Sequence, residues 1–193
     1  EQGLDPWNGV RWVAVAAYAV FMALNIAGMR IAASVELVVT LVAIFELLVF
    51  MGVVAPGFSL DAFTRGGWAG HDTFALASLG GIIAALPFAI WFFLAIEGVA
   101  NVAEEAINPQ RTMLIGFGSA ILTLVILCVL TFISSTGVAG WEAIVYKSNG
   151  DTSDSPLPLA LSHVVGNNNV LYHLLITIGL FGLIASFHGI ILA

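Results

Sequence analysis

Several ionisable side chains lie inside long apolar runs of the sequence. Glu46 and Glu97 are each enclosed in such a run, and His188 lies in the last one. A charged group at the centre of a bilayer costs about 2.5 to 3.5 kcal/mol on insertion scales, so such groups face protein or water and mark substrate or proton pathways. The two acids are therefore candidates for binding a proton or another cation, and His188 for facing a substrate.

The segment around Glu97 also holds side chains that suit an amine. Pro87 interrupts its helical pattern, and aromatic residues follow within two turns. Broken membrane helices offer free backbone groups to substrates, and aromatic rings attract ammonium groups. The candidate substrate-binding residues are Trp91, Phe92, Phe93, Leu94, Glu97 and His188. Two interpretations of residues 87–100 stay open: a binding segment, or a kinked helix that packs in a bundle.

Glu46 and His188 each have two interpretations. Glu46 is a proton-coupling group or a partner for a cation; alternatively, it is paired with a polar group on a helix absent from this sequence, or it lies near the outer interface. His188 is a group that changes its charge as histidines do near neutral pH, or one that faces the substrate path; alternatively, its ring is satisfied by a contact within a helix bundle.

The residue types needed for most enzymes do not cluster. His71, His163 and His173 have no regular spacing to each other or to paired acids, and Cys128 is the only cysteine. No serine-histidine-aspartate set or phosphate-binding loop occurs. We predict no cofactor, no metal site and no enzymatic activity.

The composition indicates a membrane protein. Of the 193 residues, 60% are hydrophobic and 9% are charged, whereas soluble domains average about a quarter charged residues. A net charge of −7 with only five Lys or Arg leaves no basic surface for a phosphate backbone, which excludes nucleic acid as a partner. We therefore expect the chain to be embedded in a lipid bilayer.

The apolar runs predict an all-α polytopic membrane protein. A helix of about 20 residues crosses a bilayer. The run 73–103 is too long and too interrupted for one helix, and 135–169 reads as an exposed loop with a short interfacial helix near 157–165. The chain starts without Met and ends within an apolar run, so we expect 1–193 to be a partial transmembrane domain, an internal fragment of a longer polytopic protein. The predicted helices are 10–27, 31–54, 73–103, 113–134 and 170–193.

The basic residues give the orientation. Arg30 and Arg111 lie in short connections on one side of the membrane, and the remaining basic residues lie on the side of the long acidic loop. Short loops rich in Lys and Arg stay in the cytoplasm. We predict a multi-pass protein of the inner cell membrane, with the connection 104–111 in the cytoplasm.

Two motifs in this order resemble the amino acid-polyamine-organocation superfamily. Residues 91–111 are similar to its sixth helix and following loop, and residues 25–30 are similar to the turn between its fourth and fifth helices. The shared features are an aromatic-rich start, an acid-Gly pair, a Glu pair and an Asn-Pro-basic sequence: Trp91-Phe92-Phe93, Glu97-Gly98, Glu104-Glu105, Asn108-Pro109-Gln110-Arg111 and Asn25-Ile26-Ala27-Gly28-Met29-Arg30.

The resemblance implies a fold and a set of roles. The chain would form helices four to eight of a twelve-helix transporter of five-plus-five inverted-repeat design, with a discontinuous sixth helix. Trp91 would be an aromatic gate, residues 92–95 the unwound stretch, and Glu97 an acid that shapes the site and responds to protons. Ala43 stands where some members carry a Lys in place of sodium, so the coupling ion, proton or sodium, stays open.

The finer resemblance favours a small amine as substrate. Residues 95–100 and 186–191 are most similar to bacterial ethanolamine permeases, which predicts a secondary transporter of ethanolamine. A general amino acid or polyamine permease is the nearest alternative. A non-transport membrane subunit or a membrane enzyme is the alternative from a different class.

Overall fold

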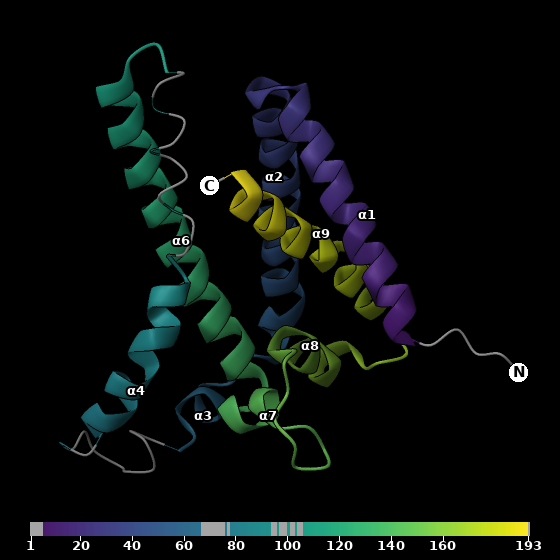
Figure 1. Cartoon of the computed structure of the whole chain (residues 1–193). Helices are drawn as coiled ribbons and strands as arrows, with labels where there is room; N and C mark the ends of the chain where they lie inside the picture. Colours follow the sequence, from purple (N-terminus) through teal and green to yellow (C-terminus); the bar gives the residue numbers. More distant parts are fainter. Residues whose placement is uncertain are drawn as a thin grey trace, which may run out of the picture.

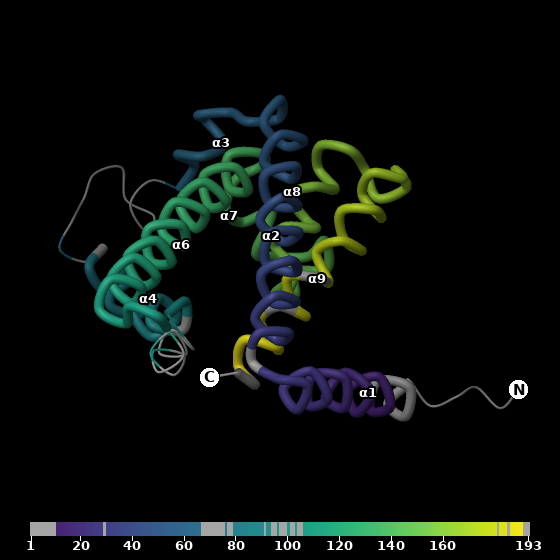
Figure 2. Tube along the Cα trace, turned by 90° about the horizontal axis from the view of Figure 1, so that it is seen from above, coloured from purple at the N-terminus to yellow at the C-terminus, as the bar shows by residue number. Residues whose placement is uncertain are grey.

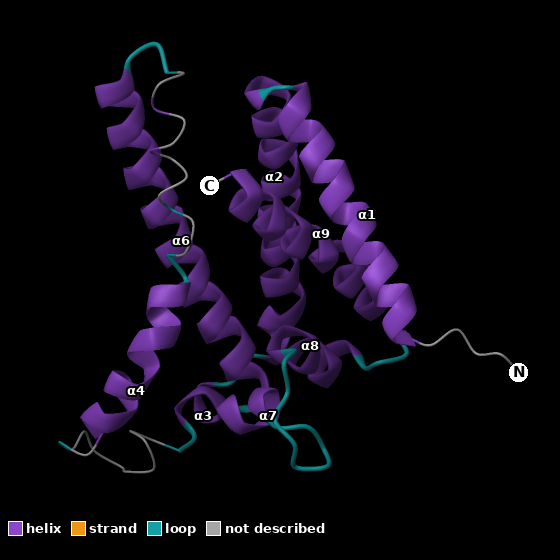
Figure 3. Ribbon diagram, in the orientation of Figure 1, coloured by secondary structure: helices purple, strands orange, loops and turns teal. Residues whose placement is uncertain are grey.

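The computed structural model is all-helical wherever it describes the chain. It describes residues 6–66, 76, 78–93, 96, 100, 103 and 106–192. Within them there is no β-strand, only an isolated bridge between Tyr146 and Thr152 (Figure 3). The elements are α1 (Pro6–Ala27), α2 (Met29–Val54), η1 (Ala55–Gly57), α3 (Leu60–Thr64), α4 (Ser78–Trp91), α6 (Pro109–Ala139), α7 (Trp141–Val145), α8 (Pro156–Val165) and α9 (Val170–Leu192).

Three of the described helical segments are long and apolar enough to cross a membrane. They are Arg30–Gly57, Pro109–Ala139 and Val170–Ile190, while Arg11–Ala27 and Leu79–Ile90 are shorter apolar helices. The prediction of an all-α membrane protein is confirmed. Most side chains on these helices are exposed, as expected of helices whose apolar faces contact lipid or further protein rather than water.

Local chemistry sets where the helices begin and end. Gly28 adopts φ +115° between α1 and α2, a conformation that a side chain would strain. At the start of α6, the Asn108 side chain accepts a hydrogen bond from the Arg111 backbone N–H and Pro109 occupies the first turn, both strong helix-start signals. The turn at Gly28 and the start of α6 lie at the same end of the bundle, the top of Figure 1.

The antiparallel pair α2 and α9 forms the centre of the bundle, as both views show (Figures 1 and 2). Three glycines on α9 face α2: Gly179 opposite Glu46, Gly182 opposite Ala43, and Gly189 opposite Glu36. The number of residues between successive glycines of α9 equals the number between their partners on α2, counted in the opposite direction. The register of the two helices is therefore regular. Glycines at such spacings allow two membrane helices to approach closely.

A buried core closes one end of this pair. Phe50 and Val54 of α2 pack with Ala160 and Leu161 of α8 and with Leu175 of α9, and Ile144 of α7 completes the cluster. The short helices α3, α7 and α8 lie together at this end, opposite the Gly28 turn (Figure 1). They fix the ends of α2, α6 and α9 relative to one another.

Two predicted boundaries are wrong by about a helical turn. The helix predicted at 113–134 extends over Pro109–Ala139, and the segment 135–169, predicted as an exposed loop with a short helix near 157–165, also contains α7 and the end of α6. Helix α8 lies where that short helix was predicted. The hydroxyls of Ser135 and Thr136 both donate to the carbonyl of Phe132, so these polar residues are satisfied inside the helix and can be buried. Leu161 is likewise buried rather than interfacial, because it faces the core.

The contact between α6 and the segment after α2 depends on a glycine. The Phe58 ring lies directly against Gly137, where a Cβ atom would clash, and the Ser59 N–H donates to the Gly137 carbonyl at 2.8 Å. We expect Gly137→Ala to destabilise the protein by about 1 to 3 kcal/mol, because an added methyl group overpacks this contact. Thermal unfolding in detergent would show it as a lower midpoint.

Gly118 in the same helix is the matched control, because a Cβ there meets nothing within 4 Å. Gly118→Ala should leave the midpoint unchanged or raise it slightly, because Ala is the better helix former. A midpoint for Gly137→Ala equal to that of Gly118→Ala would contradict the proposed contact.

Candidate functional site

A histidine and a glutamate join α9 to α2 inside the bundle. Nδ1 of His188 lies 2.8 Å from Oε2 of Glu36, and the two residues are 152 positions apart in the sequence. His188 is 1% exposed and the Glu36 side chain 26%. Burying a polar group is costly unless it has a hydrogen-bond partner, and this contact gives each of the two side chains such a partner.

Neighbouring groups enclose the pair from two other directions. The Phe21 ring of α1 stacks on the His188 ring, with centroids 4.7 Å apart and an angle of 20° between the ring planes. On α2 itself, the Thr40 hydroxyl donates to Oε1 of Glu36 at 3.3 Å. The second nitrogen of His188, Nε2, is buried and makes no hydrogen bond to any described residue. The pair therefore has one polar atom left for a further partner.

The glycines of α9 make room for the acids of α2. A Cβ atom at Gly189 would lie 3.6 Å from Oε1 of Glu36, and one at Gly179 would lie 3.8 Å from Oε1 of Glu46. Glu46 is half-buried, and it has no hydrogen-bond partner within the described ranges. The two acids lie on one face of α2, about 15 Å apart by helix rise, and only Glu36 has a basic partner there.

Apart from His188, the predicted substrate-binding residues belong to the end of α4 and the residues that follow it. Helix α4 ends at Trp91, whose side chain is not described, and Phe92 and Phe93 follow in turns with exposures of 55% and 39%. Their N–H groups bond to the carbonyls of Ala89 and Ile90. Leu94 and Glu97 lie outside the described residues.

The structure does not bring His188 to this aromatic segment. Helices α4 and α9 lie apart in both views (Figures 1 and 2). His188 instead contacts Phe21 and Glu36. Of the predicted site residues, His188 and Glu46 share the interface between α2 and α9, and Phe92 and Phe93 form a separate exposed segment.

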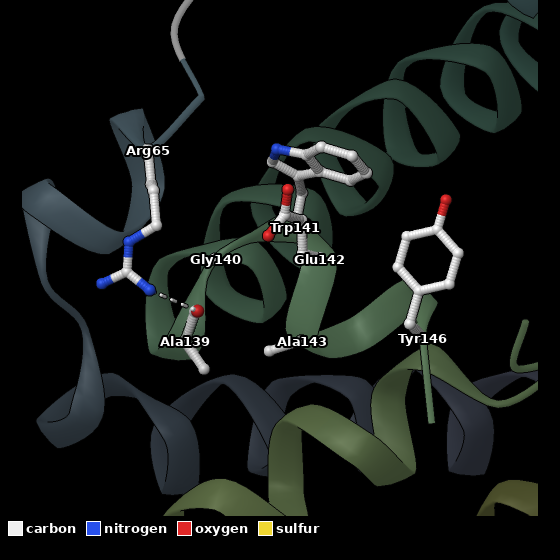
Figure 4. Close-up of a pocket in the computed structure, with 7 residues that line it drawn as sticks. All are labelled: Arg65, Ala139, Gly140, Trp141, Glu142, Ala143 and Tyr146. Atoms are coloured by element: carbon white, nitrogen blue, oxygen red, sulfur yellow. Dashed lines mark hydrogen bonds between the residues drawn. The ribbon is translucent and has the colours of Figure 1, made fainter. Parts of the chain in front are cut away.

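A second polar site lies at the other end of the bundle. A cavity of about 370 Å³ is lined by Arg65 after α3 and by Trp141, Glu142 and Tyr146 of the α7 segment (Figure 4). Sequence analysis placed Arg65 in a loop and assigned no role to the other three. In the described part of the chain, no group of three or more metal-ligating side chains occurs.

Comparison with known protein families identifies the family of this chain. The family model described as amino acid permease matches residues 3–193. The chain belongs to the amino acid permease family. No solved structure gives a significant match.

Curated relatives of this permease chain are transporters. It is 39% identical over 62 residues to an uncharacterised transporter of Rhizobium meliloti, covering 32% of the chain and 13% of the relative. It is 29% identical to a vacuolar cationic amino acid transporter of Arabidopsis thaliana, covering 86% and 26%. It is 26% identical to an arginine/ornithine antiporter of Pseudomonas aeruginosa, covering 79% and 30%. The permease chain thus spans less than a third of the length of these relatives.

Glu36 is the residue of this permease site that sequence reasoning missed. It lies near the start of an apolar run, where an acid reads as interfacial, and nothing in the sequence relates it to His188. One signal could have revealed the pairing. The intervals between the glycines of α9 equal the intervals between their opposite residues on α2, taken in reverse order: Gly179, Gly182 and Gly189 lie opposite Glu46, Ala43 and Glu36. That signal requires knowing that the two helices are antiparallel neighbours.

A double-mutant cycle tests the pair in the permease. We expect Glu36→Ala and His188→Ala to be less destabilising together than the sum of the two single changes, with a coupling energy of about 0.6 to 1.7 kcal/mol, typical of hydrogen bonds between membrane helices. Reversible unfolding of the full-length protein in mixed micelles measures it.

The control cycle pairs His188→Ala with Glu46→Ala, because Glu46 lies far along the same face. These changes should be additive within about 0.5 kcal/mol. Additivity in the Glu36 cycle as well would contradict the interaction.

Proposed function

We propose that this chain is part of a secondary transporter that carries a small amine, with ethanolamine as the first substrate to test. Membership in the amino acid permease family supports transport. The ethanolamine assignment rests on the resemblance of residues 95–100 and 186–191. A general amino acid or polyamine permease is the alternative, and the names of the arginine antiporter relatives favour it.

The proposed substrate site is the segment that follows α4. Trp91, Phe92 and Phe93 would pack over the ammonium group, Leu94 would belong to the unwound stretch, and Glu97 would supply the negative charge. In the proposed twelve-helix arrangement, missing helices would complete this site. The connection 104–111 would face the cytoplasm of a cell with this protein in its inner membrane.

The observation that supports proton coupling in this transporter is the buried contact between His188 Nδ1 and Glu36 Oε2, which lie 2.8 Å apart. With one proton on the pair, the pair is neutral overall; without that proton, it holds a net negative charge against Phe21 and a glycine. A buried unpaired charge is costly, so proton loss favours the entry of a cation elsewhere in the bundle. We propose proton coupling at this pair, with Glu46 as a second acid on the same helix face.

The charged surroundings of the pair are sparse. Helix α1 contributes the apolar ring of Phe21, and α2 contributes Thr40 besides Glu36. Arg30, one and a half turns before Glu36, is exposed. Among the described side chains, no second acid or base contacts the pair. The net charge of the pair therefore depends only on whether Glu36 and His188 hold a proton.

Uptake into proteoliposomes containing the full-length protein tests the substrate. We expect radiolabelled ethanolamine to accumulate, to be displaced by unlabelled ethanolamine but not by amino acids, and to be lost in Glu97→Gln. Uptake of amino acids instead would move the protein to the general permeases. Absence of uptake for amines, amino acids and polyamines would favour a membrane subunit or enzyme.

The coupling proposal has a separate readout. We expect Glu36→Gln and His188→Gln to abolish accumulation driven by a pH gradient while preserving exchange of labelled for unlabelled substrate, because exchange needs no net proton movement. Asp61→Asn, an acid-to-amide change at an exposed position of α3, is the control and should retain both activities. Gradient-driven accumulation that survives in both variants would overturn coupling at the pair and leave the substrate assignment standing.

A further inference from the structure

The cavity at the α3 and α7 end of the bundle carries two opposite charges that do not neutralise each other. Arg65 and Glu142 both line it, yet among the described residues they form no ion pair with one another. Its volume of about 370 Å³ lies near the lower end of the range of small-molecule sites. This cavity contains none of the residues proposed for transport.

The backbone positions the two charges on separate walls. Helix α6 ends because Gly140 adopts φ +92°, so α7 begins immediately and presents Trp141 and Glu142 beside the end of α6. Nη1 of Arg65 donates to the carbonyl of Ala139 at 3.4 Å. This bond holds the guanidinium at the last turn of α6, where unpaired carbonyl groups favour a cation. A guanidinium has five N–H donors, so most of them remain for a ligand.

Two aromatic rings complete the cavity. The rings of Trp141 and Tyr146 have centroids 6.4 Å apart and planes inclined by 59°, and both residues are more than 40% exposed. In the view of Figure 4, Arg65 and Tyr146 lie on opposite sides, with Trp141 and Glu142 between them. An ammonium group near Glu142 would therefore also lie beside aromatic faces, which attract cations.

We propose that this cavity binds a free amino acid. The ligand's carboxylate pairs with the Arg65 guanidinium, its ammonium group pairs with the Glu142 carboxylate, and its side chain lies against Trp141 and Tyr146. A simple amine satisfies Glu142 but leaves Arg65 facing a cation, and a simple carboxylate leaves Glu142 facing an anion. The site therefore selects molecules that carry both charges, whatever substrate the permease transports.

The test uses a probe inside the cavity, so that binding at the transport site does not interfere. The full-length protein, labelled with 5-fluorotryptophan and held in lipid nanodiscs, gives a fluorine NMR signal for Trp141, assigned by its loss in Trp141→Phe. We expect L-alanine to shift this signal saturably. L-lactate, which lacks the ammonium group, and ethanolamine, which lacks the carboxylate, should bind at least about tenfold more weakly, since each loses one charge-assisted interaction.

Two variants and a control identify the groups responsible. Arg65→Gln and Glu142→Gln should each weaken the binding of L-alanine at least about tenfold. If Arg65→Gln impairs folding, Arg65→Lys replaces it in the test, and this variant should retain part of the alanine response because it keeps the positive charge. Asp61→Asn, close to Arg65 in sequence but absent from the cavity lining, should leave it unchanged. Three results would each overturn the proposal: an alanine response that neither Arg65→Gln nor Glu142→Gln changes, equal responses to all three ligands, or no response to alanine. Trp141 and Tyr146 would then be interpreted as interfacial anchors.

Discussion

The packing of glycines on α9 against acids on α2 is the constraint on which the rest of the structure depends. Carboxylates can lie inside a bilayer only where something other than lipid covers them. Gly179 and Gly189 leave space for Glu46 and Glu36 without separating the two helices. His188, one position before Gly189, then contacts Glu36 within the bundle, with Nδ1 of His188 2.8 Å from Oε2 of Glu36.

The other helices differ in how they pack around this pair of residues. Helix α1 covers the pair, because the Phe21 ring stacks on His188 and shields it from lipid. Helix α8 closes the opposite end, where Leu161 and Leu175 are buried with Phe50 and Val54. Helix α6 packs on α2 and α8 near this end, whereas α4 makes little contact with the centre. The exposed apolar side chains of α4 and α6 suit contact with lipid or with further membrane helices.

The two polar sites illustrate how depth changes the behaviour of charges. Inside the bundle, Glu36 and His188 are buried in direct contact, because a buried polar group without a partner is costly. At the end of the bundle, the exposed side chains of Arg65 and Glu142 line one cavity and form no ion pair with each other among the described residues, because water can solvate each of them. The first arrangement suits a group that holds a proton. The second leaves both charges available to a dissolved ligand.

The sequence by itself determined the membrane setting, the helical class and the family. Apolar runs of bilayer length, few charges and the motifs around Gly28 and Glu97 are local properties of the chain, so they can be recognised without knowing its packing. The extent of α6 and the partner of His188 were decided by tertiary structure. Burial of Ser135 depends on a hydroxyl bond within the helix and on neighbours of α6, and Glu36 meets His188 only because two helices far apart in the sequence pack antiparallel in one register.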